Sequence, residues 1–276
     1  MDKRNLYINH YWSKLVFFIT FLIFINVHAY DQSYFEGKPY IDDANGKVYI
    51  FGSPDESVEK IKPSLFELIK RYPGKNWRII LQRNYNYIES IDIHPLNIKE
   101  QEAKNFSMEF IQAFSHLFGI NPTEISYSTK ISGKRFSTRF FQNINNIPIV
   151  HSFLGFHFED DGLVSISSRL YPNAKRFITD TIPKITEEQA CEIACKDAYK
   201  MEKGRLPPYL ECSKCELAIV PKKYATFVSD EKQKDFYLVW QIDVGLDPQK
   251  YGLFSYEYYI DAMTGELINK WSNILY

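Results

Sequence analysis

Apolar residues recur at helical spacing in three segments of the chain. The clearest is 98–118, where they fall at steps of three and four: Ala103, Phe106, Phe110, Ala113, Phe114, Leu117 and Phe118. This stripe predicts an amphipathic helix whose aromatic side packs on a sheet. Gly119 and Asn121-Pro122 predict where this helix ends. The other two helices are predicted over 57–72 and after Thr186, a suitable N-cap residue.

Between these helices, apolar and polar residues alternate with the period of two that is typical of β-strands. The alternating segments are 47–52, 77–93, 125–170, 216–220, 236–244, 254–261 and 267–271. Turn residues such as Asn145-Asn146 divide the longest of them into antiparallel strands. The order of segments predicts an α+β protein of two consecutive units, each with a helix packed on an antiparallel sheet, joined near 170–185.

The composition supports a folded protein and disfavours one class of partner. The chain has 276 residues, 45% of them hydrophobic, which is enough for one large or two ordinary domains and is not typical of a disordered chain. The formal net charge is −1, and acidic and basic residues form no long runs. We therefore expect no nucleic-acid partner.

The N-terminal segment is typical of a signal peptide. Lys3, Arg4 and Lys14 precede an apolar run at 15–27, which is shorter than the ~20 residues that span a bilayer. Small residues at Val27-His28-Ala29 fit a cleavage site, so we expect residues 1–29 to be removed and the protein to be periplasmic or extracellular. The alternative is an uncleaved segment that anchors the protein, which would be its only membrane contact.

All four cysteines lie close together in the sequence, as Cys191 and Cys195 followed by Cys212 and Cys215. The first two are four residues apart on a predicted helix, so both thiols lie on one face. An even number of cysteines in an exported chain favours disulfides, and all three pairings remain open. A four-thiolate zinc site is the alternative, because the two spacings offer a tetrahedral ligand set. We expect no other cofactor.

The sequence lacks the usual motifs of hydrolases and nucleotide-binding enzymes. It contains no H-E-x-x-H, no G-x-S-x-G and no phosphate-binding glycine loop. His151 and His157 lie six residues apart on a predicted strand, about 20 Å from end to end, too far to bind one metal ion. The sequence therefore predicts no catalytic and no metal-binding histidine.

Two groups of motifs carry a resemblance to a known family. Residues 139–150 (RFFQNINNIPIV), followed by 153–158 (FLGFHF) and Asp161-Gly162, resemble the fungalysin/thermolysin propeptide domain. Residues 185–190 (ITEEQA), 238–244 (LVWQIDV) and 259–267 (YIDAMTGEL) resemble a PepSY domain. Pro148 would begin the second strand of a hairpin, where no ladder donor is lost, and Gly265 would form a tight turn.

The resemblance implies a division of the chain and a set of structural residues. After the signal peptide predicted at 1–29, it gives the N-terminal part of a pro-region at 30–98, a propeptide unit at 99–172, a linker at 173–184 and a cystatin-like, PepSY-type domain at 185–276. The four cysteines depart from the family pattern. The motif residues are Arg139, Gln142, Pro148, Gly162, Trp240, Asp261 and Gly265.

The resemblance also implies a function. Such pro-regions assist the folding of a thermolysin-type metalloprotease and keep it inactive, whereas this sequence reaches Tyr276 without a catalytic domain. We therefore expect a non-catalytic exported protein that inhibits a metalloprotease, or helps it to fold, in trans, with Trp271 and Tyr276 as contact residues. The alternatives are the pro-region of a truncated or split protease precursor, and an envelope scaffold that reuses the fold.

Overall fold

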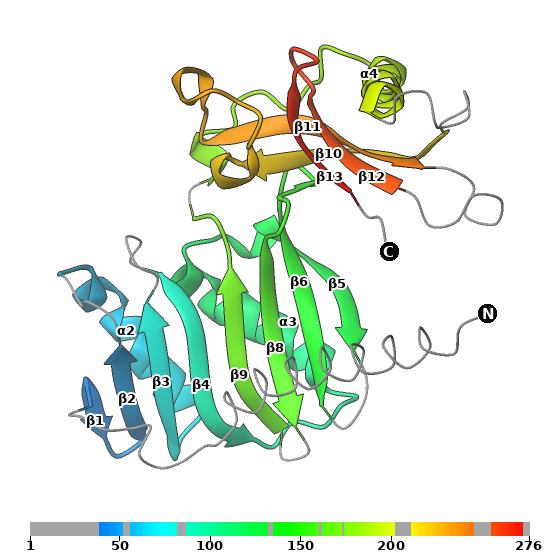
Figure 1. Cartoon of the computed structure of the whole chain (residues 1–276). Coiled ribbons are helices and arrows are strands. Elements are labelled where there is room, and N and C mark those ends of the chain that lie inside the picture. Colours follow the sequence, from blue (N-terminus) through cyan, green and yellow to red (C-terminus); the bar gives the residue numbers. More distant parts are fainter. Residues whose placement is uncertain are drawn as a thin grey trace, which may run out of the picture.

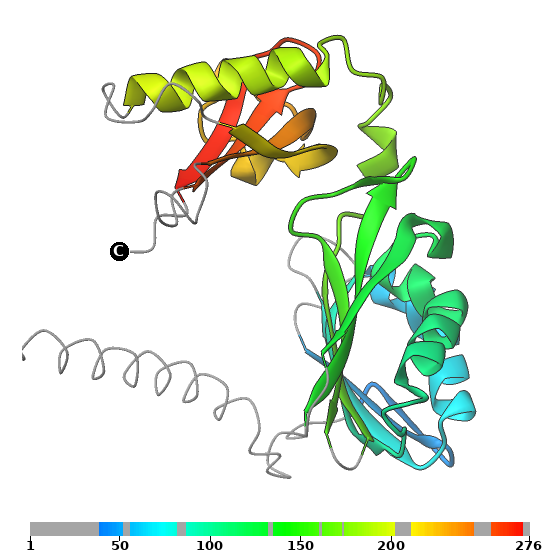
Figure 2. The same cartoon turned by 90° about the vertical axis from the view of Figure 1, so that its right-hand side faces the viewer.

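The computed structural model describes residues 39–51, 56–81, 87–131, 135–159, 162–172, 174–201, 211–245 and 255–272. Within these ranges the chain forms two sheets, placed one above the other in Figure 1, and helices lie against one face of each sheet in Figure 2. The predicted signal peptide (1–29) and Tyr276 lie outside the described ranges. None of the described helices is both long and apolar enough to cross a membrane.

The first sheet contains nine strands among the described residues. They are β1 (Ile41–Asp43), β2 (Gly46–Phe51), β3 (Lys75–Leu81), β4 (Ile88–Leu96), β5 (Ile125–Ile131), β6 (Phe136–Ile144), β7 (Ile147–Pro148), β8 (Phe153–Glu159) and β9 (Gly162–Arg169). Their order is β1-β2-β3-β4-β9-β8-β6-β5, with β7 paired to β6, as Figure 1 shows for the longer strands.

One pair in this sheet departs from the predicted antiparallel arrangement. Strands β2 and β3 are parallel, with Val48 opposite Trp77. The chain between them forms α2 (Glu56–Arg71), and a parallel pair requires such a crossover. The prediction of a purely antiparallel sheet is therefore wrong for β2 and β3, and the other pairs of the sheet are antiparallel.

Helix α3 (Ala103–Phe114) packs its aromatic stripe on the first sheet. The Phe110 ring lies 5.0 Å from the Phe114 ring and 5.6 Å from that of Phe156 on β8. The helix is shorter than predicted, because it begins at Ala103 and its last turn, 115–118, is a 3-10 helix. Gly119 closes that turn in the left-handed conformation, with φ of 69°, as predicted.

The second sheet is antiparallel and is covered by α4 (Glu187–Met201). Its strands follow the order of the chain: β10 (Glu211–Pro221), β11 (Phe236–Gly245), β12 (Ser255–Asp261) and β13 (Leu267–Ser272). Thr186 caps α4 as predicted. Its hydroxyl accepts a hydrogen bond from the Gln189 backbone, and the Gln189 side chain accepts one from the Thr186 backbone.

The predicted α+β class is confirmed, but the first unit is larger than expected. Strand β4 pairs with β9, with Ile91 opposite Ile166, so residues from 30–98 and 99–172 share one sheet and one core. That core is covered by two helices, α2 and α3, rather than by the single helix predicted.

The hairpin predicted around Pro148 is much shorter than expected. Asn145 and Asn146 have positive φ and form the predicted turn, but the strand that follows, β7, has only two residues. His151, with φ of 58°, then redirects the chain, and β8 takes the place beside β6. Because β8 continues the pairing with β6, the residues between β7 and β8 lie outside the first sheet and can contact the second one.

Candidate functional site

The two sheets meet at the segment that follows β7. Ile149 forms an isolated parallel bridge with Ile219 of β10, and the Val150 N–H donates a hydrogen bond to the Ile219 carbonyl at 2.9 Å. Ile149, Ile219 and Leu238 belong to one buried cluster, which also contains Ala174 from the linker. The motif segment around Pro148 therefore joins the two units through both backbone and side-chain contacts.

Gln142 fixes the start of the linker at this junction. The side chain is fully buried; its amide oxygen accepts a hydrogen bond from the Tyr171 N–H at 2.8 Å. Its amide nitrogen donates to the Tyr171 carbonyl at 3.1 Å and to Glu124 at 3.3 Å. The backbone polar groups of Tyr171 are thus satisfied by one side chain, and Tyr171 is held where the first sheet ends.

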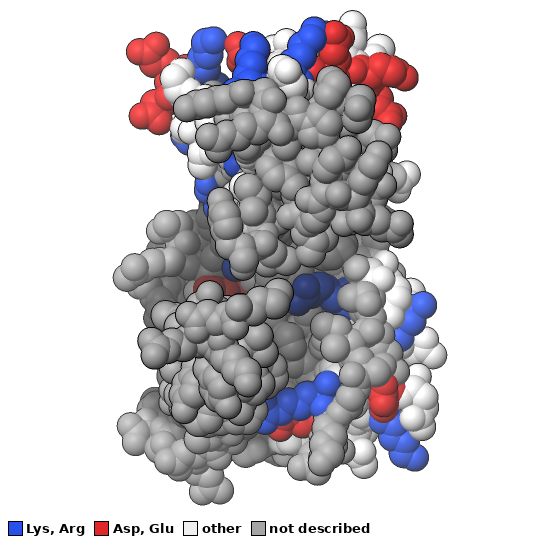
Figure 3. Space-filling model, turned by 45° about the vertical axis from the view of Figure 1, so that its right-hand side comes forward, with Lys and Arg blue, Asp and Glu red and all other residues white. Residues whose placement is uncertain are grey.

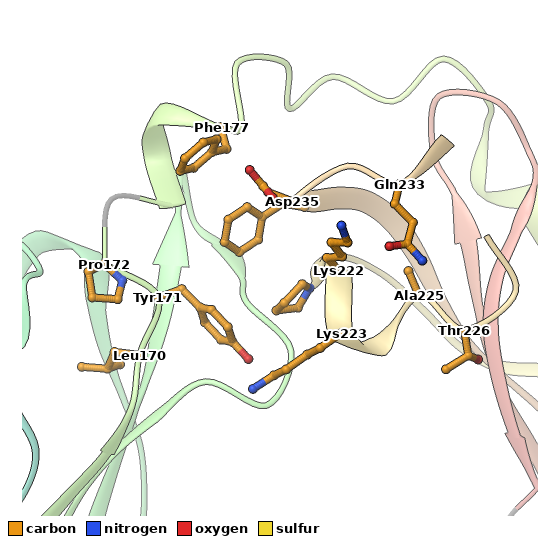
Figure 4. Close-up of a pocket in the computed structure, with 12 residues that line it drawn as sticks. Leu170, Tyr171, Pro172, Phe177, Lys222, Lys223, Ala225, Thr226, Gln233 and Asp235 are labelled. Atoms are coloured by element: carbon orange, nitrogen blue, oxygen red, sulfur yellow. The ribbon is translucent and has the colours of Figure 1, made fainter. Parts of the chain in front are cut away.

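Tyr171 belongs to a row of aromatic side chains that crosses the junction between the two sheets. The Phe236 ring packs edge-on against the Tyr171 ring at 5.8 Å, and the Phe177 ring lies 6.1 Å from Phe236. Lys223 places its ammonium 5.2 Å from the centre of the Tyr171 ring and 5.0 Å from that of Tyr224. Tyr171 and Phe177 come from the segment that follows β9, whereas Lys223 and Tyr224 come from the β10–β11 connection and Phe236 begins β11. The two segments face each other in Figure 4.

The row continues on the other side of Lys223 toward the last strand. The His151 ring lies 4.6 Å from the Tyr224 ring and 6.0 Å from that of Trp271, and Trp271 packs edge-on against Tyr259 at 4.8 Å. We call the whole row the junction band, defined as Phe177, Phe236, Tyr171, Lys223, Tyr224, His151 and Trp271. The expected contact residue Trp271 is thus half-buried within this band rather than projecting alone.

A cavity of about 650 Å³ lies along the linker side of the junction band. Its walls are Leu170, Tyr171, Pro172 and Phe177 on one side and Lys222, Lys223 and Gln233 on the other (Figure 4). Phe236 also lines the cavity. The Phe177 side chain is 57% exposed although it is large and apolar. Large aromatic side chains that remain partly exposed around a hollow are typical of a surface that binds another molecule.

Burial changes the acid–base properties of two members of the junction band. Burial, reinforced by the neighbouring Tyr224, raises the pKa of the Tyr171 hydroxyl well above its ordinary value. Partial burial lowers the pKa of His151 below its ordinary value of 6.5. Both side chains are therefore neutral at pH 7, so the fixed charges beside the cavity are those of Lys222, Lys223 and Asp235.

Aromatic rings and the ammonium group of Lys223 make up the junction band. Within the described parts of the chain, no group of three or more His, Cys, Asp or Glu side chains is placed to hold a metal ion. The charged surface at the end that carries α4 shows acidic and basic side chains interspersed (Figure 3). The junction band presents aromatic rings and an ammonium group, which can bind another molecule through noncovalent contacts.

The other motif residues lie away from the junction band and shape turns and packing. The Asp261 carboxylate accepts hydrogen bonds from the backbone of Met263 and Thr264, and the Gly265 N–H donates to the Asp261 carbonyl. Gly265 has φ of 77°, as expected for a tight turn. The Trp240 indole donates to the carbonyl of Ile185 at 3.1 Å and so ties the segment before α4 to the second sheet.

The remaining motif positions, Gly162 and Arg139, belong to the first sheet. Gly162 has φ of 111°, and a Cβ there would lie 1.6 Å from the Leu96 carbonyl oxygen, so only glycine fits. Arg139 is exposed, and its guanidinium lies 5.5 Å from the Phe153 ring. The four cysteines are brought together between α4 and β10.

Sequence patterns alone do not predict most of the junction band. Tyr171 and Phe177 fall at the linker, and Lys223 and Tyr224 fall between two strands, where no periodicity applies. The available signal was the presence of large aromatic residues in turn segments, since loops that carry function often hold such residues.

Comparison with known proteins identifies the second unit. Residues 184–271 match the PepSY family model, described as "Peptidase propeptide and YPEB domain", and thus form a PepSY domain. Domains of this kind are generally non-catalytic. The match does not include residues 99–172, so the fungalysin/thermolysin propeptide unit stays a prediction. A search of curated proteins found no match.

Among solved structures, the chain is similar to the Bacillus megaterium YpeB C-terminal domain. The identity is 14%, and the alignment covers 80% of this chain and 99% of that chain, with a TM-score of 0.35. A score this low does not establish a common arrangement of the whole chain.

Proposed function

We propose that this protein is a non-catalytic, exported binding protein that acts in trans on a thermolysin-type metalloprotease, as an inhibitor or a folding helper, and that the junction band makes the contact. The observation that carries the proposal is the match of residues 184–271 to a family described by its peptidase propeptides. A propeptide acts by holding its peptidase, which requires a binding surface and no chemistry of its own.

The junction band supplies the kind of surface that such binding requires. Interfaces concentrate their binding energy in a few aromatic side chains near the centre of the contact. Phe177 is a large apolar ring of the band that is 57% exposed, and the cavity beside it is bounded by Lys222 and Lys223. A segment of the protease that places an apolar side chain beside Phe177 and a carboxylate near these lysines would match both features.

The test starts from the full chain, expressed with a tag in an exporting host and incubated with the secretion fraction of its native cells. A captured metalloprotease is then assayed with a fluorogenic peptide, and its refolding yield is measured, with and without the protein. We expect the protein to lower the peptidase activity or to raise the refolding yield. A protease that shows neither response would contradict the proposal.

Two variants locate the contact. Phe177→Ala removes an exposed ring of the junction band, whereas Phe66→Ala removes a ring that is 42% exposed on α2, in the first unit. We expect the first variant to weaken the effect on the protease by about 30-fold, as for an interface hot spot, and the second to leave it unchanged. Equal behaviour of the two variants would remove the junction band from the proposal.

A further inference from the structure

The four cysteines converge between α4 and β10. The sulfur atoms of Cys195 and Cys212 lie 3.7 Å apart. Cys191 lies close enough to Cys212 and Cys215 to raise the pKa of both thiols, so each thiol on the helix has a neighbour on the strand. All four side chains are half-buried and pack against the core between the helix and the second sheet.

The helix brings its thiols close to the strand because its inner face is made of small side chains. Ala190, Ala194 and Ala198 are completely buried at spacings of four residues. A methyl group is the smallest side chain that still fills a core position, so α4 can approach the sheet closely. Cys191 and Cys195 each follow one of these alanines and therefore lie along one edge of the same face.

The strand presents both of its thiols to the helix because it contains a bulge. In a regular strand, residues three apart point to opposite faces. The register shifts between Cys212 and Lys214, so Cys212 lies opposite Val244 and Cys215 opposite Ile242. Val244 and Ile242 are two residues apart and both belong to the core under α4. The extra residue, Ser213, thus places both thiols on the helix side.

We propose that these thiols form two disulfides, Cys195–Cys212 and Cys191–Cys215, which clamp α4 to β10. The direction of the chain supports this pairing, because β10 returns along α4 and residues late in the helix meet residues early in the strand. The opposite pairing would need Cys195 to reach Cys215, whose thiol neighbour is Cys191. Pairing within each element would leave the helix and the strand unlinked.

Each bond forms by two thiol–disulfide exchanges with a disulfide-bearing oxidant, such as a thiol–disulfide oxidoreductase. One thiolate of the pair attacks the oxidant's disulfide and gives a mixed disulfide. The second thiolate then displaces the oxidant, which leaves as a dithiol carrying the two electrons and two protons of the pair. The hydrogen bond from Cys212 lowers the pKa of Cys195, which favours the thiolate form at Cys195 over Cys212.

Zinc held by the same four cysteines is the competing outcome. It requires at least three ligands placed around one point, and no such group occurs among the residues the structure describes. Disulfides need only two sulfur atoms at a time, and those of Cys195 and Cys212 already lie 3.7 Å apart.

The experiment maps the bonds in the full chain, exported to an oxidising compartment and purified without reductant. Free thiols are blocked with N-ethylmaleimide in denaturant, and the digest is mapped by mass spectrometry. Zinc is measured on the same sample. We expect Cys195–Cys212 and Cys191–Cys215 peptides, no blocked cysteine and no stoichiometric zinc. Free thiols, another pairing, or one zinc per chain would each overturn the proposal.

Two double variants sharpen the result. The variant C195S with C212S leaves Cys191 and Cys215, which we expect to form one disulfide. The variant C191S with C212S leaves Cys195 and Cys215, which we expect to remain free thiols. A disulfide in the second variant would show that the pairing is not fixed by the fold. As a measurement on the unchanged protein, reductant should lower its thermal midpoint, and an unchanged midpoint would contradict the clamp.

Discussion

The two sheets hold their helices in different ways. Helix α3 covers the first sheet with large rings, among them Phe110 and Phe114, which pack with Phe156 and the fully buried Trp77 in one extensive core. Helix α4 covers the second sheet with methyl groups, since its buried face is Ala190, Ala194 and Ala198. Burial of each additional CH₂ contributes about 0.8 kcal/mol, so the alanine face contributes far less hydrophobic stabilisation than the aromatic one.

In the second unit, individual side-chain interactions compensate for part of the weaker hydrophobic stabilisation of α4. Asp197 on α4 accepts a hydrogen bond from Tyr258 at 3.1 Å and forms an ion pair with Lys270 at 2.6 Å. The four cysteines lie at the β10 side of the same helix. The comparison shows that a helix whose buried face is made of small residues relies on individual hydrogen bonds, ion pairs or disulfides to hold it on the sheet. Small domains, whose hydrophobic cores are also limited, often rely on such interactions.

The largest effect is expected from Phe110→Ala. Phe110 is fully buried between Phe114 and Phe156, and truncation of a buried phenylalanine costs about 3–5 kcal/mol. Urea unfolding measures the free energy of unfolding. Met108→Ala, at a position of the same helix that is 46% exposed, is the control and should change it little. A loss below about 1 kcal/mol for Phe110→Ala would contradict the assignment of the ring packing as the main support of α3.

Removal of the Cys195–Cys212 link comes next. The two residues are 17 apart in sequence, and closing a loop of about this length stabilises by about 3 kcal/mol in the chain-entropy account. We expect the variant C195S with C212S to unfold at lower urea than the unchanged protein. In reductant the two proteins should become equal, and a difference that persists there would show that packing, not a disulfide, is responsible.

Gln142→Leu tests the link between the first sheet and the linker. Leucine has a similar volume but leaves the backbone N–H and carbonyl of Tyr171 without their partner, at a cost of about 1–3 kcal/mol. The same substitution at Gln112, which is exposed on α3, serves as the control. If both variants are equally stable, the contact between Gln142 and Tyr171 does not hold the junction together.

The smallest effect concerns pH. The pKa of His151 is lowered by burial, so the unfolded chain takes up this proton before the folded protein does as the pH falls below 6.5. Its contribution to stability is therefore complete above that pH and is lost as the pH falls through the lowered pKa. His151→Asn tolerates the positive φ and cannot titrate, so it should weaken the pH dependence of the thermal midpoint.

The remaining pH dependence should come in part from His116, whose pKa is also lowered by burial. If His151→Asn leaves the dependence between pH 7 and about 5 unchanged, the assigned environment of His151 is wrong.

The sequence was sufficient for local features and insufficient for contacts between the sheets. The stripe around Phe110 predicted α3, and the motif ending at Gly265 predicted the turn before β13, because both depend on neighbouring residues. The parallel pair β2–β3 escaped prediction, since two short strands do not reveal their relative direction. The predictions of a signal peptide, of partner contact by Tyr276 and of export stay predictions.

The junction band shows most clearly which contacts could not be predicted from the sequence. Its members His151, Tyr171, Lys223 and Trp271 are far apart in sequence and meet only because Ile149 pairs with Ile219 and Gln142 holds Tyr171. A two-residue strand and one buried amide decide this arrangement, and neither has a periodic signal. The sequence showed the four cysteines as a group. That Cys212 and Cys215 both face the helix depends on the bulge at Ser213, which the sequence does not reveal.

The central claim is that the junction band binds a thermolysin-type metalloprotease. The most direct measurement is the effect of the unchanged protein, of Phe177→Ala and of Phe66→Ala on the activity and refolding yield of the captured protease. The account predicts that the unchanged protein and Phe66→Ala act alike and that Phe177→Ala needs about 30-fold higher concentration. No effect of the unchanged protein on either quantity would contradict the account.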